Sequence, residues 1–437
     1  SFYLRSGVYT MPEFLERRYS PGARWYLAIV SIFGYVVTKI SVTIAAGGIV
    51  FQALMGIDFW TGALIVVVAT GAYTIFGGLR AVLITDTLQM FVLIGGAIAV
   101  LVTGLNAIGG WGEMMDAAGP GVMSVWRPAS DPDFPWTGIL FGAPILGVWY
   151  WCTDQFIVQR TLAARNLTQA RRGTIFAAFL KLLPIFIFVI PGVIAAILAE
   201  RGVIELGIPD QALPVLVGTL LPVGIRGLVV AGLLAALMSS LSSVFNSTST
   251  LITWDVYRKL HPAASEQRLV MVGMASTAVL VGFGLLWIPL MQLISGQLYQ
   301  YIQSVQAYIA PPIAAVFLLG LISKRLNARG AMAALFTGLV LGSGRLVLEL
   351  NKARLDGMMF AFADINFLHF AALLFILCSL VLVLVSLTAP APSREKLEGL
   401  TYQTTAPSAE PPERTHLDAA LSGLVIVGTV LLWLYFS

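Results

Sequence analysis

The chain has 437 residues, of which 58% are hydrophobic and 11% are charged, and its formal net charge at pH 7 is +4. A soluble domain carries about 25% charged residues. This composition therefore excludes an ordinary soluble protein, and the small net charge gives no indication of nucleic-acid binding. Only helices or closed barrels satisfy the backbone in lipid, and barrel strands alternate apolar and polar residues. The apolar runs here are continuous, so we expect an all-α membrane protein.

About eleven segments are apolar over a length that crosses a bilayer core of about 30 Å. In chain order they lie at 25–54, 60–77, 86–108, 137–159, 173–199, 218–250, 268–290, 297–322, 330–349, 366–388 and 419–436. Arginine and lysine concentrate in alternate loops, which places the 1–24 end in the cytoplasm. Residues 1–437 therefore form a single transmembrane domain. A stretch rich in Pro, Ser, Thr and Glu at 389–418 is expected to be a flexible linker before the last span.

The sixth span ends in a polar sequence, AALMSSLSSVFNSTST, at 235–250. Three- and four-residue steps place small residues on one helix face: Ala236, Ser239, Ser240 and Ser243. Small residues allow close helix packing in membranes, which is one interpretation. The other is a sodium site, because hydroxyls and backbone carbonyls supply oxygen ligands to a hard cation.

A carboxylate stands at the start of the third span, where Asp86 lies in LITDTLQMF. It is either a helix N-cap, a position that Asp favours, or a ligand that joins Ser242 and Ser243 around a second sodium ion. Only tertiary contacts distinguish the two interpretations.

Two features place a charge or aromatic rings in mid-span. Lys181, in AAFLKLLP, is costly inside a bilayer and indicates function unless it snorkels to the interface. LGVWYWCTDQ, at 146–155, clusters Trp149, Tyr150 and Trp151. These rings indicate either packing or a surface that stacks on a sugar.

Four glutamines lie in GQLYQYIQSVQAY, at 296–308. Gln303 and Gln306 are the deepest and should face the bundle interior, because unpartnered amides are costly in lipid. The sequence gives weaker grounds for a functional role at three further intramembrane polar residues: Lys39, Thr43 and Arg345. The three histidines form no metal-binding cluster, and the chain has no phosphate loop, nucleophile triad or metalloprotease motif, so an enzyme is disfavoured.

Several segments of the sequence are long and distinctive. They are YTMPEFLERRY (9–19), TIFGGLRAVLITDTLQ (74–89), WYWCTDQFIVQRTLAARN (149–166), LMSSLSSVFNSTSTL (237–251) and GQLYQYIQSVQAYIAPPIAAVFLLGLISKRLN (296–327). Together they resemble the sodium/solute symporters, most closely the sodium/glucose cotransporter branch, over essentially the whole chain.

The resemblance implies a LeuT-like fold of two inverted five-helix repeats with peripheral helices. It assigns the remainder of the first repeat to 25–108, the second repeat to 137–322 and the peripheral C-terminal helices to 330–437. It also implies that the family's first core helix is missing from this chain.

The resemblance further implies a set of ion and sugar contacts, matched position by position. The main sodium ion takes the backbone carbonyl of Ala236 with Ser239 and Ser240. A second sodium ion takes Asp86, Ser242 and Ser243. The sugar takes Tyr150, Trp151, Lys181 and Gln303. Positions that depart from relatives, and so affect the choice of solute, are Thr43, Gly147 and Gln300.

The expected function is that of a sodium-coupled symporter that imports a hexose, glucose-like or galactose-like, by alternating access, with two sodium ions per sugar. It would lie in the plasma or cell inner membrane. Its partners would be the sugar, sodium ions and the lipid bilayer, without nucleic acid. The alternatives are a sodium-coupled transporter of another solute, such as inositol or sialic acid, and a sugar-gated sodium channel or sensor. The sequence carries no signal for an oligomeric state.

Overall fold

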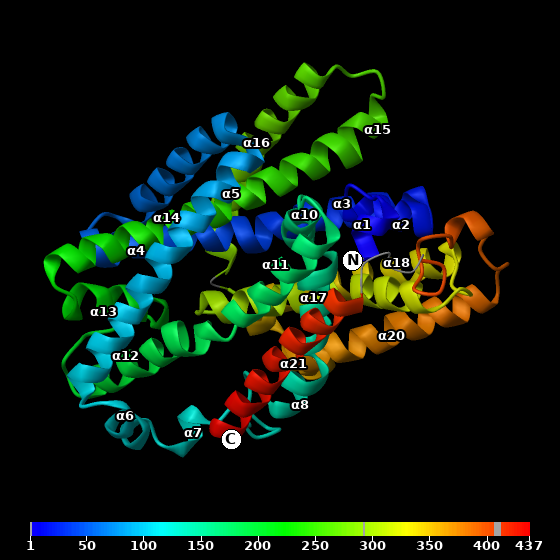
Figure 1. Ribbon diagram of the computed structural model, residues 1–437. Helices are drawn as coiled ribbons and strands as arrows, with labels where there is room; N and C mark the ends of the chain where they lie inside the picture. The colour runs from blue at the N-terminus through cyan, green and yellow to red at the C-terminus, as the bar shows by residue number, and fades with distance from the viewer. Residues whose placement is uncertain (1, 292, 406–411) are drawn as a thin grey trace.

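The computed structural model describes residues 2–291, 293–405 and 412–437, and within them every regular element is helical (Figure 1). The α-helices are α1 (Phe2–Ser6), α2 (Met11–Arg18), α3 (Pro21–Tyr35), α4 (Ser41–Met55), α5 (Phe59–Ile108), α6 (Trp111–Ala118), α7 (Pro120–Met123), α8 (Trp136–Phe141), α9 (Ala143–Val148), α10 (Gln155–Leu162), α11 (Leu167–Leu180), α12 (Ile190–Glu200), α13 (Ala212–Leu220), α14 (Val223–Thr250), α15 (Arg258–Leu260), α16 (Glu266–Met291), α17 (Leu298–Ile322), α18 (Ala328–Leu350), α19 (Gly357–Asp364), α20 (Phe367–Leu387) and α21 (Pro412–Tyr435). Several π-helical turns interrupt them: η1 (Val36–Ile40), η2 (Trp149–Thr153), η3 (Ile185–Val189) and η5 (Leu251–Tyr257).

Nine helical segments of the described chain are long and apolar enough to cross a membrane. The two remaining predicted spans take different forms. The predicted span at 60–77 begins in the apolar helix Phe59–Ala72, which continues into Asp86–Ile108 within the single 50-residue helix α5. The predicted span at 137–159 is broken into α8, α9, η2 and α10.

Helix α5 is too long for one straight crossing of a bilayer. Fifty residues of straight helix would extend about 75 Å, more than twice a bilayer core of about 30 Å. Figure 1 shows the α5 ribbon changing direction along its length. The single helix α5 therefore contains both spans that the sequence predicts for this region.

Polar caps and a glycine set several helix ends. Ser20 accepts a hydrogen bond from the Ala23 N–H and caps α3, whose first residue is proline. Thr10 and Asn327 cap α2 and α18 in the same way, which satisfies backbone donors that a helix N-terminus leaves free. α4 ends at Gly56 with a φ of 66°, a conformation that glycine adopts without strain.

Three apolar clusters form the core. The first joins α2, α3, α9 and η2 to α17, α18 and α20. The second surrounds η1 and α4 with residues of α14, α16 and α17. The third packs α12 and α13 against α5 and α14. η1 therefore lies in the second cluster, and η2 contributes Trp149 to the first.

Part of the segment at 389–418, which composition predicts to be a flexible linker, is hydrogen-bonded to the bundle. The Tyr402 N–H donates to the Leu321 carbonyl at 3.0 Å. The last helix, α21, already begins at Pro412, and residues 406–411 lie outside the described residues. Hydrogen bonds to the bundle hold part of this segment in place, and composition does not reveal such bonds.

Glycines let α17 and α18 approach closely. A Cβ added at Gly342 would lie 2.2 Å from the Tyr308 carbonyl oxygen, and one added at Gly338 would lie 2.3 Å from Pro312 Cβ. Gly344, on the same helix, faces open space. Small residues are enriched where membrane helices pack backbone to backbone, and this pair of helices follows that rule.

We expect Gly342→Ala to destabilise the detergent-purified protein by about 1–3 kcal/mol, because overpacking forces backbone or side chains to shift. Gly344→Ala makes the same change in open space and should leave the melting temperature unchanged. Fluorescence-detected thermal unfolding measures both variants. Equal melting temperatures would contradict the close contact between α17 and α18.

Candidate functional site

The π-helical turns coincide with the polar and aromatic residues of the bundle interior. η1 contains Lys39, η2 contains Tyr150 and Trp151, η5 contains Asp255, and η3 begins four residues after Lys181. Such turns are rare and occur frequently at functional sites. The helices are therefore irregular at Lys39, at the ring pair of Tyr150 and Trp151, and at Asp255.

Tyr150 and Trp151 form an aromatic platform beside Lys181. The two rings meet edge to face with centroids 5.1 Å apart. Lys181 Nζ lies 5.2 Å from the centroid of the Trp151 ring. Trp151 is 42% exposed, so part of its side chain is not covered by the bundle. A flat ring can stack on the apolar face of a sugar while the ammonium donates to its hydroxyls.

Gln303 lies on α17, which packs against η2. Its side chain is half-buried. Among the described residues, the hydrogen-bond pattern does not join Gln303 to Trp151 or Lys181. Gln300, one turn earlier, donates to Asp133 at 2.6 Å and accepts from a nearby serine. The structure thus brings three of the four predicted sugar contacts together and places the fourth on an adjacent helix.

Asp86 contacts the serine-rich face of α14. It lies inside α5 rather than at its first turn, so the helix N-cap interpretation is wrong. Its carboxylate accepts a hydrogen bond from Ser239 Oγ. Ser242 Oγ donates in turn to the Ser239 carbonyl at 2.9 Å. Residues assigned to two separate sodium ions therefore share one hydrogen-bonded cluster.

The other members of that face differ in burial. Ser242 and Ser243 are buried, Ala236 and Ser239 are half-buried, and Ser240 is exposed. Carboxylate, hydroxyl and carbonyl oxygens are the ligands that a hard cation takes. The cluster therefore offers the oxygen ligands that sodium needs, with one negative charge at Asp86.

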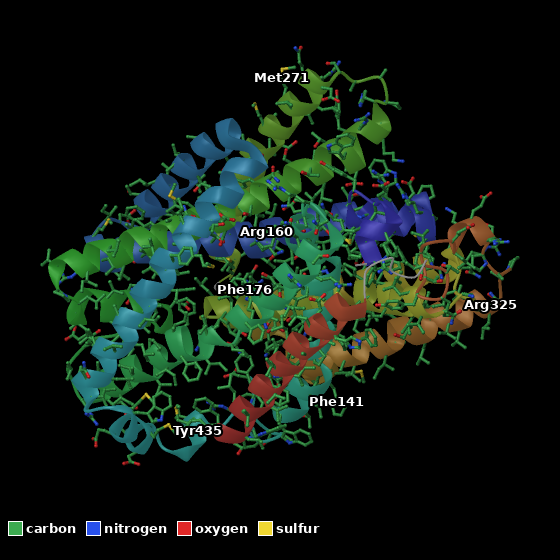
Figure 2. The ribbon with its side chains drawn as sticks, viewed as in Figure 1. Phe141, Arg160, Phe176, Met271, Arg325 and Tyr435 are labelled. Carbon is green, nitrogen blue, oxygen red and sulfur yellow. The ribbon has the colours of Figure 1, made fainter. Side chains whose placement is uncertain are left out.

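Arg160, labelled in Figure 2, is a further member of this cluster that the sequence patterns do not single out. Its Nη2 lies 3.1 Å from Asp86 Oδ2 and donates to Ser243 Oγ at 2.6 Å. An arginine near the end of an apolar segment ordinarily faces the loop side, so its sequence position hides this contact. The one sequence feature that could have pointed to this contact is that α10 contains no acidic residue to pair with Arg160.

A buried ion pair joins η1 to the end of η2. Lys39 Nζ donates to Asp154 Oδ2, and the Tyr35 hydroxyl donates to Asp154 Oδ1. The Asp154 side chain is 0% exposed and that of Lys39 is 7% exposed. Asp154 also caps α10 by accepting the Phe156 N–H at 3.1 Å. This one carboxylate therefore holds three donors from two distant parts of the chain.

Aromatic rings enclose the Lys39 ammonium. Its Nζ lies 4.4 Å from the ring centroid of Phe156, 4.6 Å from that of Tyr35 and 5.2 Å from that of Tyr150. Ring faces attract cations, and more strongly when water is excluded. Lys39 thus contacts both Asp154 and Tyr150 of the aromatic platform. The sequence gives only weak grounds to expect a functional role for this lysine.

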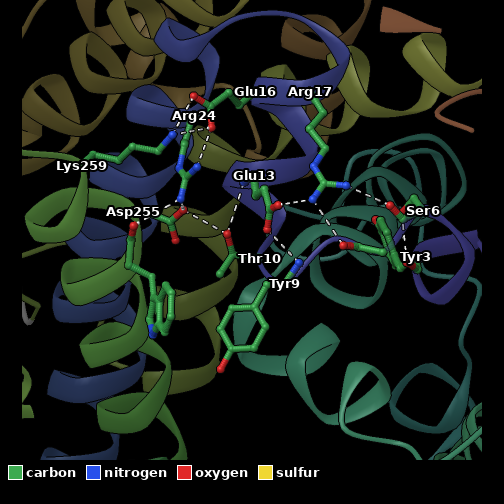
Figure 3. Close-up of polar contacts among 12 residues, drawn as sticks. Tyr3, Ser6, Tyr9, Thr10, Glu13, Glu16, Arg17, Arg24, Asp255 and Lys259 are labelled. Carbon is green, nitrogen blue, oxygen red and sulfur yellow. Dashed lines mark hydrogen bonds and ion pairs between the residues drawn. The ribbon is translucent and has the colours of Figure 1, made fainter. Parts of the chain in front are cut away.

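A second charged cluster ties α2 and α3 to η5 and α15. Figure 3 shows Arg24 between Glu16 and Asp255, with Lys259 also reaching Glu16. Arg24 lies 2.5 Å from Glu16 and 2.7 Å from Asp255. Lys259 lies 3.1 Å from Glu16, and Thr10 Oγ1 donates to Asp255 at 3.0 Å. The cluster lies at the end of the bundle that the loop charges assign to the cytoplasm.

Glu16 is held ionised by this cluster. Burial raises the pKa of its carboxyl, but the hydrogen bonds from Arg24 and Lys259 outweigh burial and hold the pKa below its ordinary value of 4.5. A cavity of about 570 Å³ opens beside the cluster, with Arg24, Lys259 and Trp254 among its lining residues. Arg24 and Lys259 therefore border this cavity, whereas the Asp255 side chain is fully buried.

Broken helices that hold paired charges, hydroxyls and aromatic rings inside a membrane bundle are typical of solute transporters. A family model for the sodium:solute symporter family matches residues 1–338. A sodium/mannose cotransporter from Bos taurus is 40% identical over 92% of this chain and 74% of its own length. The chain belongs to the sodium:solute symporter family.

Further comparisons agree with this assignment. Sodium/glucose cotransporter 1 from Sus scrofa is 38% identical over 89% of this chain and 65% of its own length. A sodium/myo-inositol cotransporter from Mus musculus is 37% identical over 92% of this chain and 62% of its own length. The chain thus spans somewhat less than two thirds of these two relatives.

The fold is similar to the substrate-bound outward-open state of a Na+-coupled sialic acid symporter. The TM-score is 0.72 at 22% identity, over 90% of this chain and 80% of that chain. The predicted all-α, LeuT-like fold is confirmed. The family consists of sodium-coupled transporters and not enzymes, so sodium is the coupled ion, as the sequence predicts.

The buried pair gives a stability prediction. Lys39→Met leaves Asp154 charged and unpaired, and breaking a buried pair in this way costs about 3–5 kcal/mol. The double variant with Asp154→Asn should recover much of this loss, because asparagine still caps α10. Thermal unfolding in detergent measures both variants, with Lys324→Met, at an exposed position, as the control. A double variant no more stable than Lys39→Met would contradict the pairing.

Acid should weaken the second cluster. A carboxyl whose pKa is lowered in the folded state contributes stability above its unfolded pKa, and this is lost as pH falls through the folded value. Glu16→Gln should therefore lower the melting temperature at pH 7, and the difference from wild type should shrink below about pH 4. Glu266→Gln, at an exposed position, should show no such pH-dependent difference. A Glu16→Gln effect that is constant with pH would rule out the ionised pairing.

Proposed function

We propose that the chain is a sodium-coupled symporter that imports a hexose across the plasma or cell inner membrane by alternating access. The similarity to cotransporters named for mannose, glucose and myo-inositol, at 37–40% identity, carries this proposal. These solutes share a ring with several hydroxyls. The aromatic platform and Lys181 offer chemistry suited to such a ring.

In this proposal the sugar lies against Trp151, with Tyr150 closing one side. Lys181 Nζ, 5.2 Å from the Trp151 ring centroid, donates to a sugar hydroxyl at the edge of the ring. Gln303 on α17 supplies an amide that can donate and accept at a second hydroxyl. The buried pair of Lys39 and Asp154 fixes the end of η2 and so holds the platform in place.

Sodium would bind on the serine-rich face of α14. The Ala236 carbonyl with Ser239 and Ser240 would hold one ion, and Asp86 with Ser242 and Ser243 a second. One sodium ion gains about 2.3 kcal/mol per 100 mV of membrane potential. Two ions therefore give about 4.6 kcal/mol, which sustains roughly a 10³-fold sugar gradient at about 1.4 kcal/mol per decade.

A second candidate solute is myo-inositol, which the similarity to the Mus musculus cotransporter favours. Inositol has the ring hydroxyls of a hexose but no ring oxygen. It would use the same platform and the same ion sites. Parallel uptake of labelled inositol and labelled hexoses distinguishes the two solutes.

We expect purified full-length protein in liposomes to accumulate labelled glucose, galactose or mannose only with an inward sodium gradient. Gln303→Ala should raise the half-saturating sugar concentration about tenfold, the effect of losing one hydrogen bond of about 1–1.5 kcal/mol. The half-saturating sodium concentration should change by less than about twofold, because an uncharged amide adds little at the ion sites.

Gln169→Ala, which removes an exposed amide on α11, is the matched control and should transport like wild type. Accumulation without sodium would contradict symport. Sodium current without uphill sugar uptake would instead favour a sugar-gated channel or sensor. Unchanged sugar affinity in Gln303→Ala would remove that residue from the site.

A further inference from the structure

The Arg160 guanidinium occupies the place proposed for the second sodium ion. One nitrogen, Nη2, lies 3.1 Å from Asp86 Oδ2 and 2.6 Å from Ser243 Oγ, two of the three residues assigned to that ion. The other Asp86 oxygen accepts the Ser239 hydroxyl. We propose that Arg160 is a tethered cation that competes with sodium for Asp86 and Ser243, so that the second ion binds only when Arg160 withdraws. This inference rests on the proposed function.

Charge balance leads to this conclusion. Asp86 brings one negative charge, Arg160 one positive charge that is never lost in proteins, and the serine hydroxyls none. A sodium ion arriving with the guanidinium in place would put two positive charges beside a single carboxylate, and like charges at such short range repel. Asp86 and Ser243 therefore hold one cation at a time, either the guanidinium or the second sodium ion.

The surroundings of Arg160 let it move without loss of its helix. Its side chain is 32% exposed, against 21% for Asp86. The Phe156 ring centroid lies 4.9 Å from the guanidinium carbon. Gln159 holds α10 to α14 independently, because its Nε2 donates to Ser247 Oγ at 2.6 Å. Rotation of this one half-buried side chain is enough to vacate Asp86.

Competition of this kind links the ion to the sugar side of the bundle. Arg160 lies on α10, which begins directly after the aromatic platform of η2. Its two contacts join α10 to α5 through Asp86 and to α14 through Ser243. Exchange of Arg160 for sodium would release α10 from α5. Sodium binding at Asp86 would therefore free the helix that follows the aromatic platform to move.

The test compares Arg160→Gln with wild type in proteoliposomes and in detergent. If Arg160 fills the site about nine-tenths of the time, its removal lowers the half-saturating sodium concentration for uptake about tenfold, because apparent affinity scales with the vacant fraction. Sodium, compared with choline, should also raise the melting temperature of Arg160→Gln more than that of wild type. Added free guanidinium should restore the wild-type sodium dependence.

Arg165→Gln, the same charge change at an exposed position nearby, should leave sodium dependence unaltered. Arg160→Lys keeps a charge but loses the planar geometry of guanidinium, so its half-saturating sodium concentration should fall less than that of Arg160→Gln. It replaces Arg160→Gln in the test if that variant folds poorly. Sodium dependence equal to wild type in whichever of these Arg160 variants folds would overturn the inference. Sugar accumulation by wild type without sodium would instead defeat the proposed function, so the two failures are distinct.

Discussion

The ion pair between Lys39 and Asp154 organises the centre of the molecule. A charge inside a membrane bundle has little water to solvate it, so each partner must be held by the other and by further hydrogen bonds. Asp154 receives Lys39, the Tyr35 hydroxyl and the backbone of α10, which is why the broken helix ends where it does. The aromatic platform immediately precedes this point, so its position follows from the pair.

Two other ion pairs repeat the arrangement. Arg24 with Asp255 and Asp86 with Arg160 each join a helix before residue 109 to a helix after residue 135, as Lys39 with Asp154 does. The resemblance predicts that residues 25–108 and 137–322, which contain Lys39 with Asp154 and Asp86 with Arg160, belong to opposite repeats of the fold, and Arg24 lies directly before the first of them. Any movement of one stretch against the other must carry or exchange these charges. The pairs therefore connect the arrangement of the helices to the ions and solute that the family transports.

Much of this architecture could be predicted from the sequence, because apolar runs and polar breaks are local properties of the chain. The helical spans, the serine-rich face and the aromatic cluster of η2 follow from composition and spacing. The ion pairs do not, since their partners are far apart in sequence. The sequence alone gives little reason to expect a functional role for Lys39, and it places Arg160 among the positive charges of a cytoplasmic loop. The hydrogen bond from the Tyr402 N–H to the Leu321 carbonyl of α17 could not be predicted either, because it joins backbone groups that no side-chain pattern reports.

Coupling between sodium and sugar is the central claim, and binding linkage in the purified protein tests it most directly. Coupling is reciprocal, so sodium must change sugar affinity by the same factor as sugar changes sodium affinity, typically about 5–150-fold. Equilibrium binding of labelled hexose with and without sodium, and of labelled sodium with and without hexose, gives both factors. Sodium-coupled symport predicts two equal factors above about fivefold. Sugar binding that is indifferent to sodium would contradict it.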